Sequence, residues 1–526
     1  MLHASLAILN ANIITLSRKK TKAEAVAIYD GKFVAVDSNK NVREFVNAQT
    51  KVVDVKNQTV VPGLVDCHVH MTGFGYSLQS LDLRNVKSIK EMQQKLREYA
   101  QRNPVLPWIL GRKWDQEQFE EKRYPTCSDL DAAVPDRPVF LRRVCGHACI
   151  VNTRALQAAG ITEKTSVKSG KIDLDQKTKK PTGILRENAI DLVSQAVPQP
   201  SPALLERVCL LACQNALKTG LTCVHWLVES TDEIRAIQHL HMQGRLPLRV
   251  RLGIPIAFLD DLLALGLITG FGNSMIKIGP IKILADGSLG AHTAAMKRPY
   301  ADKPDTKGMM LYTAKELNAL VSKTHKAGLQ LAIHAIGDHT IEKVLDAFEN
   351  ALKEHPHKNH RHRVEHCSVL NPKSIDRLKR LNLIASVQPH FVPSDFWVAE
   401  RVGKTRARWV YPFKTLLQKK IVVVSGSDSP VEPIDPLLGI WAAVNRKDSP
   451  MERLTVKEAL KTYTLNAAYS SSEENIRGTI EPGKLADLTV LSEDITKIPP
   501  EHIRKVQVEM VVVNGKIVYQ SKQRRL

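Results

Sequence analysis

The sequence lacks any long, uninterrupted apolar stretch. No window of the 526-residue chain approaches the roughly 18 apolar residues that a membrane-spanning helix needs, so we expect no membrane span. The first fourteen residues are moderately apolar, but Asn10 and Asn12 interrupt them and no small-residue cleavage site follows. We therefore expect no secretory signal.

The sequence also lacks the cysteine spacing of a zinc ribbon or a disulfide framework. Its eight cysteines are scattered and include no Cys-x-x-Cys pair. This distribution is typical of reduced thiols packed in the core of a cytosolic protein. We predict a cytoplasmic protein with free thiols.

A concentrated basic motif is missing too, although the formal net charge is +21. Such a charge is compatible with phosphate neutralisation by a nucleic-acid-binding protein. The Lys and Arg residues are, however, spread in small groups over the whole length, and no aromatic residues are interleaved with them. We expect a basic solvated surface and no nucleic-acid partner. A hydrophobic content of 43% and a charged content of 25% are ordinary for a soluble globular protein.

Both ends of the chain carry short alternating apolar patterns that predict β-strands. At the start they cover 7–14, 25–29, 32–36 and 52–55, and Asp30-Gly31 is a two-residue hairpin turn. The pattern returns at 487–491, 508–513 and 516–519, with Asn514-Gly515 as a second turn. We predict one small composite β-sandwich made from residues 1–58 and 478–526.

The middle of the chain, residues 59–477, alternates strand and helix. Ser201-Pro202 and the pair Thr313 and Glu316 are helix-start signals between the strands. The predicted strands are 60–65, 221–226, 248–254, 278–285, 329–335, 363–367, 383–387 and 421–426. Eight such units predict an α/β fold, a (β/α)8 TIM barrel. The interval of about 84–200 lacks this rhythm, so we expect it to be an insertion above the barrel mouth.

His68 and His70 follow the first predicted strand, which is reached through Pro62-Gly63. Side chains two apart on a strand share a face, so both imidazoles can bind one metal ion. The pair alone is weak evidence, because the chain holds four His-x-His pairs where chance gives roughly 0.6. The other three lie in a helical pattern or a polar linker. Packing of the two histidines in a core is the alternative.

Further chemical groups stand at the ends of other predicted strands, where the catalytic residues of a barrel lie. They are Lys282, His334, Glu365-His366 and Asp428. Singly, each histidine could be a hydrogen-bonded core residue, and Asp428 before Ser429-Pro430 could form a turn. Lys282 between isoleucines is harder to explain, because burying an unpaired ammonium is unfavourable. A buried lysine has a lowered pKa and could react with carbon dioxide to give a carbamate that bridges two cations.

The order of these residues resembles the amidohydrolase superfamily over almost the whole chain. The resemblance rests on His68-x-His70, Lys282, His334, His366 and Asp428, on the Pro-Gly-Leu-Val-Asp-Cys-His lead-in, and on the Gly478-x-Ile-Glu-Pro-Gly-Lys-Leu-Ala-Asp-Leu run. The stretch 283–290, Ile-Leu-Ala-Asp-Gly-Ser-Leu-Gly, and Gly146-His147-Ala148 resemble the YtcJ-like branch, which includes N-substituted formamide deformylases.

The resemblance implies a metal-dependent hydrolase with one or two zinc ions. His68, His70 and Asp428 would hold one zinc, His334 and His366 the second, and carboxylated Lys282 would bridge them. A metal-bound hydroxide would be the nucleophile, and Asp428 would take its proton and return it to the leaving amine. If Lys282 is not modified, a single-metal site is expected.

Further residues are expected to line the pocket of such an enzyme. His147 is the candidate for polarising the substrate carbonyl, and the others are Trp114, Asp115, Glu187, His292 and Arg298. Each could instead be an ordinary loop residue.

The expected reaction is hydrolysis of a carbon–nitrogen amide bond in a small molecule, with an N-substituted formamide as one possibility. Deamination of a cyclic amine or hydrolysis of a cyclic amide is an alternative within enzymes. A catalytically silent barrel that acts as a binding protein is an alternative of another class. A homodimer is a further possibility.

Overall fold

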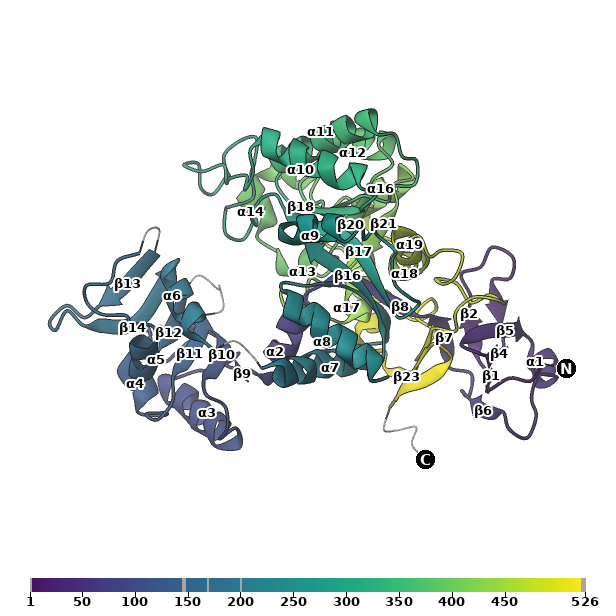
Figure 1. The fold of residues 1–526 in the computed structure, drawn as a ribbon, viewed down its shortest axis with the longest axis horizontal. Coiled ribbons are helices and arrows are strands. Elements are labelled where there is room, and N and C mark those ends of the chain that lie inside the picture. The colour runs from purple at the N-terminus through teal and green to yellow at the C-terminus, as the bar shows by residue number, and fades with distance from the viewer. Residues whose placement is uncertain (1, 144–147, 168–169, 199–200, 522–526) are drawn as a thin grey trace. The chain divides into compact units, whose positions relative to one another are not determined.

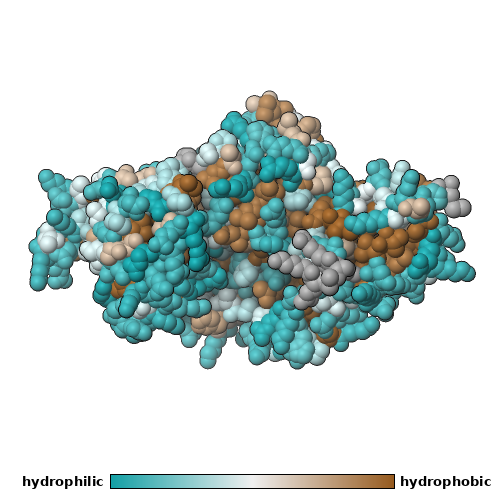
Figure 2. Space-filling model, turned by 90° about the horizontal axis from the view of Figure 1, so that it is seen from below, coloured by the Kyte–Doolittle hydropathy of each residue, from teal (hydrophilic) through white to brown (hydrophobic). Residues whose placement is uncertain are grey.

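The computed structural model describes residues 2–143, 148–167, 170–198 and 201–521. The chain forms two compact units, which we call the barrel unit (residues 1–75 and 205–526) and the inserted unit (residues 76–204). None of the helices in the described ranges is long and apolar enough to cross a membrane. In Figure 2 hydrophilic residues predominate on the visible face, and apolar residues gather in separate patches.

Eight parallel strands form the centre of the barrel unit (Figure 1). Their order follows the chain, which is the arrangement of a (β/α)8 barrel and confirms the predicted fold. The strands are β8 (Leu64–Val69), β15 (Leu221–Leu227), β16 (Arg249–Pro255), β17 (Ile276–Leu284), β18 (Leu331–Ala335), β19 (Arg363–His366), β20 (Ile384–Val387) and β21 (Val423–Ser425).

Helices connect these strands and cover the outside of the barrel. The longer ones are α7 (Pro202–Lys218), α8 (Thr231–Met242), α10 (Ala314–Lys326), α11 (Asp338–Glu354), α12 (Pro372–Arg380) and α17 (Pro436–Val444). Shorter ones are α2 (Met71–Gln79), η2 (Ile256–Phe258), α9 (Leu259–Ala264), α13 (Phe391–Ser394), α14 (Val398–Val402), α15 (Lys404–Ala407), α16 (Phe413–Gln418), η3 (Pro450–Glu452), α18 (Val456–Thr462) and α19 (Leu465–Ser470). The turn η4 (Pro500–Lys505) lies in the C-terminal segment and contacts α17.

The two chain ends build a pair of sheets within the barrel unit. One sheet has the order β5 (Lys32–Asp37), β4 (Ala25–Tyr29), β1 (Leu6–Leu9) and β6 (Lys51–Asp54), and helix α1 (Asn39–Arg43) packs beside it. The other has the order β24 (Lys516–Gln520), β23 (Val508–Val513), β22 (Leu488–Leu491), β7 (Thr59–Pro62), β2 (Asn12–Ile14) and β3 (Lys22–Ala23).

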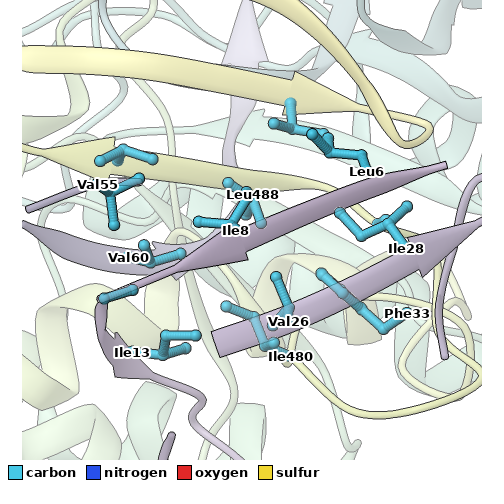
Figure 3. Close-up of a cluster of buried hydrophobic side chains, with 14 of the residues drawn as sticks. Leu6, Ile8, Ile13, Val26, Ile28, Phe33, Val55, Val60, Ile480 and Leu488 are labelled. Atoms are coloured by element: carbon cyan, nitrogen blue, oxygen red, sulfur yellow. The ribbon is translucent and has the colours of Figure 1, made fainter. Parts of the chain in front are cut away.

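Side chains from both sheets share one apolar core (Figure 3). Ile8 and Val26 of the first sheet lie in the same buried cluster as Val60 and Leu488 of the second. Burial of apolar surface between two sheets stabilises a sandwich. The composite β-sandwich predicted from the two ends of the sequence is therefore present.

The stretch predicted as one strand at 60–65 is two strands in different sheets, so that prediction was wrong. Strand β7 pairs with β22 and β2 in the sandwich, whereas β8 pairs with β15 in the barrel. The chain changes sheet at Gly63. A Cβ atom there would lie 2.3 Å from the Thr222 hydroxyl oxygen, so only glycine permits this close approach.

The inserted unit contains a mixed sheet of its own, which the sequence pattern did not predict. Its order is β13 (Gly170–Leu174), β14 (Pro181–Glu187), β12 (Ala148–Val151), β11 (Val139–Arg143), β10 (Ile109–Trp114) and β9 (Leu81–Asp82). Its helices are α3 (Ile89–Arg102), η1 (Gln116–Gln118), α4 (Cys127–Asp131), α5 (Thr153–Ala158) and α6 (Ala189–Ala196). Two buried apolar clusters within this unit give it its own core.

Candidate metal centre

The first and last barrel strands meet through hydrogen bonds at the carboxyl end of β8. The backbone N–H of Asp428, just after β21, donates to the carbonyl oxygen of His68 at 2.7 Å. The buried carboxylate of Asp66 accepts from the backbone N–H groups of His68 at 3.0 Å and Ser427 at 3.1 Å. These bonds position His68 and Asp428 next to each other.

Six side chains converge at this end of the barrel, and we call them the six-residue cluster: His68, His70, Lys282, His334, His366 and Asp428. Lys282 Nζ lies 3.4 Å from His68 Nε2, and Asp428 Oδ1 lies 3.4 Å from the Nε2 atoms of both His68 and His70. The ring of His366 has its centroid 4.8 Å from that of His68 and 4.4 Å from that of His334. The residues come from β8 and the residue just after it, from β17, β18 and β19, and from the segment after β21, so the barrel brings distant parts of the sequence together.

Hydrogen bonds assign the tautomer of His68 and His366. His68 Nδ1 donates to the Glu365 carboxylate, and His366 Nδ1 lies 2.8 Å from the side-chain oxygen of Gln388. A carboxylate or an amide oxygen can only accept, so Nδ1 carries the proton in both rings. When either ring is neutral, Nε2 is therefore the nitrogen with the lone pair.

His334 has the opposite tautomer. Its Nε2 lies 2.9 Å from the carbonyl oxygen of Gly287 and 3.3 Å from Asp286 Oδ1, so Nε2 carries the proton and Nδ1 has the lone pair. The Asp286 carboxylate also accepts from the backbone N–H groups of Ala295, Ile336 and Gly337, which fixes its position.

Burial and neighbouring charges shift the pKa values of three members of the cluster. Burial lowers the pKa of Lys282 to about 8, although nearby carboxylates raise it in part. At His70 burial acts to lower the pKa, but hydrogen bonds to Asp428 and Glu229 outweigh it and raise the pKa to about 9. Burial acts to raise the pKa of Asp428, yet His68 and His70 hold it well below its ordinary value. Asp428 is therefore ionised, and Lys282 reaches its neutral form at lower pH than an exposed lysine.

Comparison with known proteins identifies the family of this chain. The sequence profile described as "Amidohydrolase family" matches residues 51–519. The chain belongs to the amidohydrolase family.

Relatives of this amidohydrolase match it along nearly the whole chain. "Putative amidohydrolase YtcJ" of Bacillus subtilis (strain 168) is 37% identical over 97% of the chain and 98% of its own length. N-substituted formamide deformylase of Arthrobacter pascens is 26% identical over 98% of both. The crystal structure of an uncharacterized metal-dependent hydrolase from Pyrococcus horikoshii OT3 aligns with a TM-score of 0.83, at 31% identity over 94% of the chain and 99% of its own. These matches confirm the resemblance predicted from the motifs.

The side chains of this amidohydrolase fit a divalent cation. His68, His70 and Asp428 each offer one ligand atom, and these atoms lie within 4.8 Å of one another. Imidazole nitrogen and carboxylate oxygen are the ligands that zinc prefers besides thiolate. The bond from His68 to Glu365 is the carboxylate–histidine contact that commonly orients a metal-binding imidazole.

The sequence also predicted pocket residues outside the cluster, and three of those described belong to the inserted unit. Trp114 is buried in the core of that unit and its Nε1 donates to the Leu141 carbonyl oxygen at 2.9 Å. Asp115 accepts from Arg143 at 2.7 Å, and Glu187 is exposed at the end of β14. His147 lies outside the described residues.

The two remaining pocket candidates lie in the barrel unit, on the segment that follows β17. His292 Nε2 is 3.1 Å from Asp302 Oδ2. Arg298 is exposed, and its carbonyl oxygen accepts from Arg406 at 3.0 Å. His292 therefore has a contact within this segment, whereas Arg298 contacts α15.

The sequence analysis named Glu365 only as a group at a strand end and did not select Asp66, Gln388 and Asp286, although each of the four contacts a member of the cluster or its backbone. A signal existed for three of them. Asp66 is in the lead-in to His68, Glu365 immediately precedes His366, and Asp286 is in the stretch 283–290. Gln388 could have been found only from its place after β20.

Proposed function

We propose that this amidohydrolase is a metal-dependent hydrolase that cleaves a carbon–nitrogen amide bond in a small molecule. The observation that carries the proposal is the convergence of four imidazoles, one lysine amine and one ionised carboxylate at the carboxyl end of the barrel. The name of the Arthrobacter relative favours an N-substituted formamide as substrate, at 26% identity.

In this proposal the six-residue cluster holds two zinc ions. His68, His70 and Asp428 bind one, and His334 and His366 bind the other. A bound divalent cation polarises a carbonyl group and acidifies water toward neutral pH. The tautomers support these roles, because the proton-free nitrogens of His68, His366 and His334 remain available for ligation.

Lys282 would link the two halves of the cluster as a carbamate. Its neutral Nζ forms a bond to the carbon of carbon dioxide and releases a proton, which gives an anionic side chain with two oxygen ligands. The pKa of about 8, lowered by burial, supports this reaction, because the amine must be neutral to react. Without the modification a single-ion site is expected.

Asp428 is the proposed general base and general acid. Its carboxylate would accept a proton from the attacking water and return it to the nitrogen of the leaving amine. The low pKa of Asp428 supports the first step, because the ionised form accepts the proton. We retain His147 as the candidate for polarising the substrate carbonyl, and His292 and Arg298 as pocket candidates.

The test combines a substrate panel with one variant. Formamides, acylated amino acids and lactams are assayed with zinc and bicarbonate, and Asp428→Asn is compared with the wild type. We expect amide hydrolysis, with turnover about 10²- to 10⁴-fold lower in the variant. Unchanged turnover in Asp428→Asn would refute the proposed role.

Deamination of a cyclic amine is the second candidate function. It is favoured by the compact group of His68, His70 and Asp428, which alone would hold a single ion. Cyclic amines added to the substrate panel distinguish the two reactions, because a deaminase releases ammonia from the ring amine whereas a formamide hydrolase releases formate. A barrel that acts only as a binding protein would turn over no member of the panel.

We also propose a cytoplasmic location. The seven described cysteines are all unpaired, which supports a reducing compartment. Labelling the thiols in a freshly broken cell extract tests this proposal, and oxidised thiols would contradict it.

A further inference from the structure

Glu365 is a fully buried carboxylate whose two oxygens both have hydrogen-bond donors. It points into the barrel from β19, next to the six-residue cluster. Oε1 accepts from Arg363 Nε at 2.6 Å. Oε2 accepts from the Ser386 hydroxyl at 2.8 Å and from His68 Nδ1. Three donors from three strands therefore fix the position of this carboxylate.

Arg363 extends the same set of bonds to the opposite side of the barrel. Its side chain is fully buried. Nη1 donates to His225 Nδ1 on β15 at 2.7 Å, and Nη2 donates to the carbonyl oxygen of Cys67 on β8 at 2.7 Å. Cys67 directly precedes His68. The ring of His68 is therefore held through Glu365, and the backbone beside it is held through Arg363.

We propose that Glu365 and Arg363 are positioning residues that keep His68 in the tautomer that presents Nε2 to the metal ion. This inference rests on the proposed metal-binding role of His68. An ionised carboxylate has no proton to donate, so Glu365 can only accept from His68 Nδ1, and the ring proton stays on Nδ1. Arg363 holds the other oxygen of Glu365 and so prevents the carboxylate from turning away.

The substitution Glu365→Gln tests this logic, because an amide has one accepting oxygen and one donating NH2 group. If the oxygen faces Arg363, the NH2 group faces His68 and requires Nδ1 to accept, which moves the ring proton to Nε2. If the oxygen faces His68, the NH2 group opposes the Arg363 N–H inside the barrel, where an unmatched donor is costly. The first orientation satisfies the buried guanidinium, so we expect the tautomer of His68 to change.

The experiment measures the zinc dissociation constant of the full-length protein by competition with a chelator, together with urea unfolding. We expect Glu365→Gln to bind zinc about 10- to 100-fold more weakly than the wild type. Because it measures binding, the result does not depend on turnover.

The matched control is Glu473→Gln. Glu473 is also buried in the barrel unit and also accepts from arginines, Arg251 and Arg477. Its described contacts do not include His68. We expect the control to lose stability but to keep the wild-type zinc affinity, which separates a positioning effect from a general loss of packing.

A milder variant keeps the test decisive if Glu365→Gln does not fold. Ser386→Ala removes one donor to the oxygen that His68 also contacts, and we expect zinc binding about two- to tenfold weaker. Wild-type affinity in Glu365→Gln, or in Ser386→Ala when the first variant is unfolded, would overturn the inference. A wild type that binds no zinc would instead refute the proposed function.

Discussion

At the scale of single residues, the cluster is defined by which nitrogen each imidazole keeps protonated. His68 and His366 hold their proton on Nδ1, and His334 holds it on Nε2. The choice follows from one accepting oxygen beside each ring. The ring nitrogen without a proton has the lone pair that would bind a cation in the cluster.

Lys282 gives the first prediction at this scale. Lys282→Met replaces a buried amine with an apolar side chain of similar length, so the midpoint of urea unfolding should be unchanged or higher. The number of zinc ions bound in bicarbonate buffer should fall from about two to about one per chain, because the bridging carbamate cannot form. Metal analysis after dialysis measures this number.

The control for that variant is Lys277→Met, on the same strand. Lys277 contacts Glu473 at 3.0 Å, and its described contacts include no cluster member. Its zinc content should match the wild type. Two zinc ions in Lys282→Met would show that the lysine is not a bridging ligand.

The chemistry-bearing residues could be selected from the sequence because they stand at the ends of strands with clear apolar patterns. His334 and Asp428 are of this kind. Their partners were harder to select. Gln388 has no distinctive neighbours in the sequence, and its contact with His366 exists only because β19 and β20 are adjacent. Pairing between strands is a tertiary property that a local pattern does not contain.

At the scale of elements, a close contact between β21 and β8 closes the barrel. Gly426 follows β21, and a Cβ atom there would lie 2.5 Å from the His68 nitrogen and 2.8 Å from Asp66 Oδ1. Both neighbours are fixed by hydrogen bonds, so neither can move without loosening the closure. The separation of His68 and Asp428 depends on this glycine.

We therefore expect Gly426→Ala to be destabilised by about 1–3 kcal/mol, the usual cost of overpacking a tight site. Zinc affinity should fall as well, because the same displacement separates two ligands. Gly290→Ala is the control, since its Cβ would meet only the Trp397 ring at 3.9 Å. Urea unfolding of both variants measures the difference, and equal stability would contradict the steric argument.

Helix starts were the elements predicted best from sequence. The capping box of Thr313 and Glu316 begins α10, and Ser201 with Pro202 begins α7. Strand ends were less predictable. The pattern at 7–14 is split at Asn10, which has a positive φ, so β1 and β2 belong to different sheets. A period-two pattern indicates which faces are buried but not where a strand changes sheet.

At the scale of the whole barrel unit, buried ion pairs link the barrel strands to the C-terminal segment. Glu473 accepts from Arg251 on β16 and from Arg477, and it contacts Lys277 on β17. Arg249 on β16 donates to Asp487, which precedes β22 of the sandwich. Buried ion pairs therefore attach the C-terminal segment to the barrel.

This arrangement predicts an acid-sensitive contribution to stability. Burial acts to raise the pKa of Glu473, but Arg477 and Arg251 outweigh it and hold the pKa far below its ordinary value of 4.5. The folded state thus binds the proton less tightly than the unfolded state. The stabilisation is complete above about pH 4.5 and is lost as the pH falls below it.

Urea unfolding of the wild type and Glu473→Gln across pH 3 to 7 measures this contribution. At pH 7 the variant should be less stable by about 3–5 kcal/mol, the usual cost of removing one partner from a buried pair. The difference should shrink below about pH 4.5, because Glu473 then binds a proton in the unfolded wild type and the free energy of unfolding of the wild type falls. A difference that is constant with pH would contradict the assignment.

The sequence predicted the barrel and the composite sandwich, because each has a strong period and clear turn signals such as Asp30-Gly31 and Asn514-Gly515. It did not predict the sheet of the inserted unit. There β9 has only two residues, and β13 and β14 carry few buried positions. Contacts with neighbouring strands and with the core of the inserted unit stabilise such strands. Local sequence periodicity contains no information about these contacts.

The proposed metal centre is tested most directly by the number of divalent ions that the cluster holds. Metal analysis of the purified protein after dialysis against zinc in bicarbonate buffer measures it. We expect about two zinc ions per chain, or about one if Lys282 is unmodified. Fewer than about one zinc per chain would contradict the central claim that these six side chains form a metal centre.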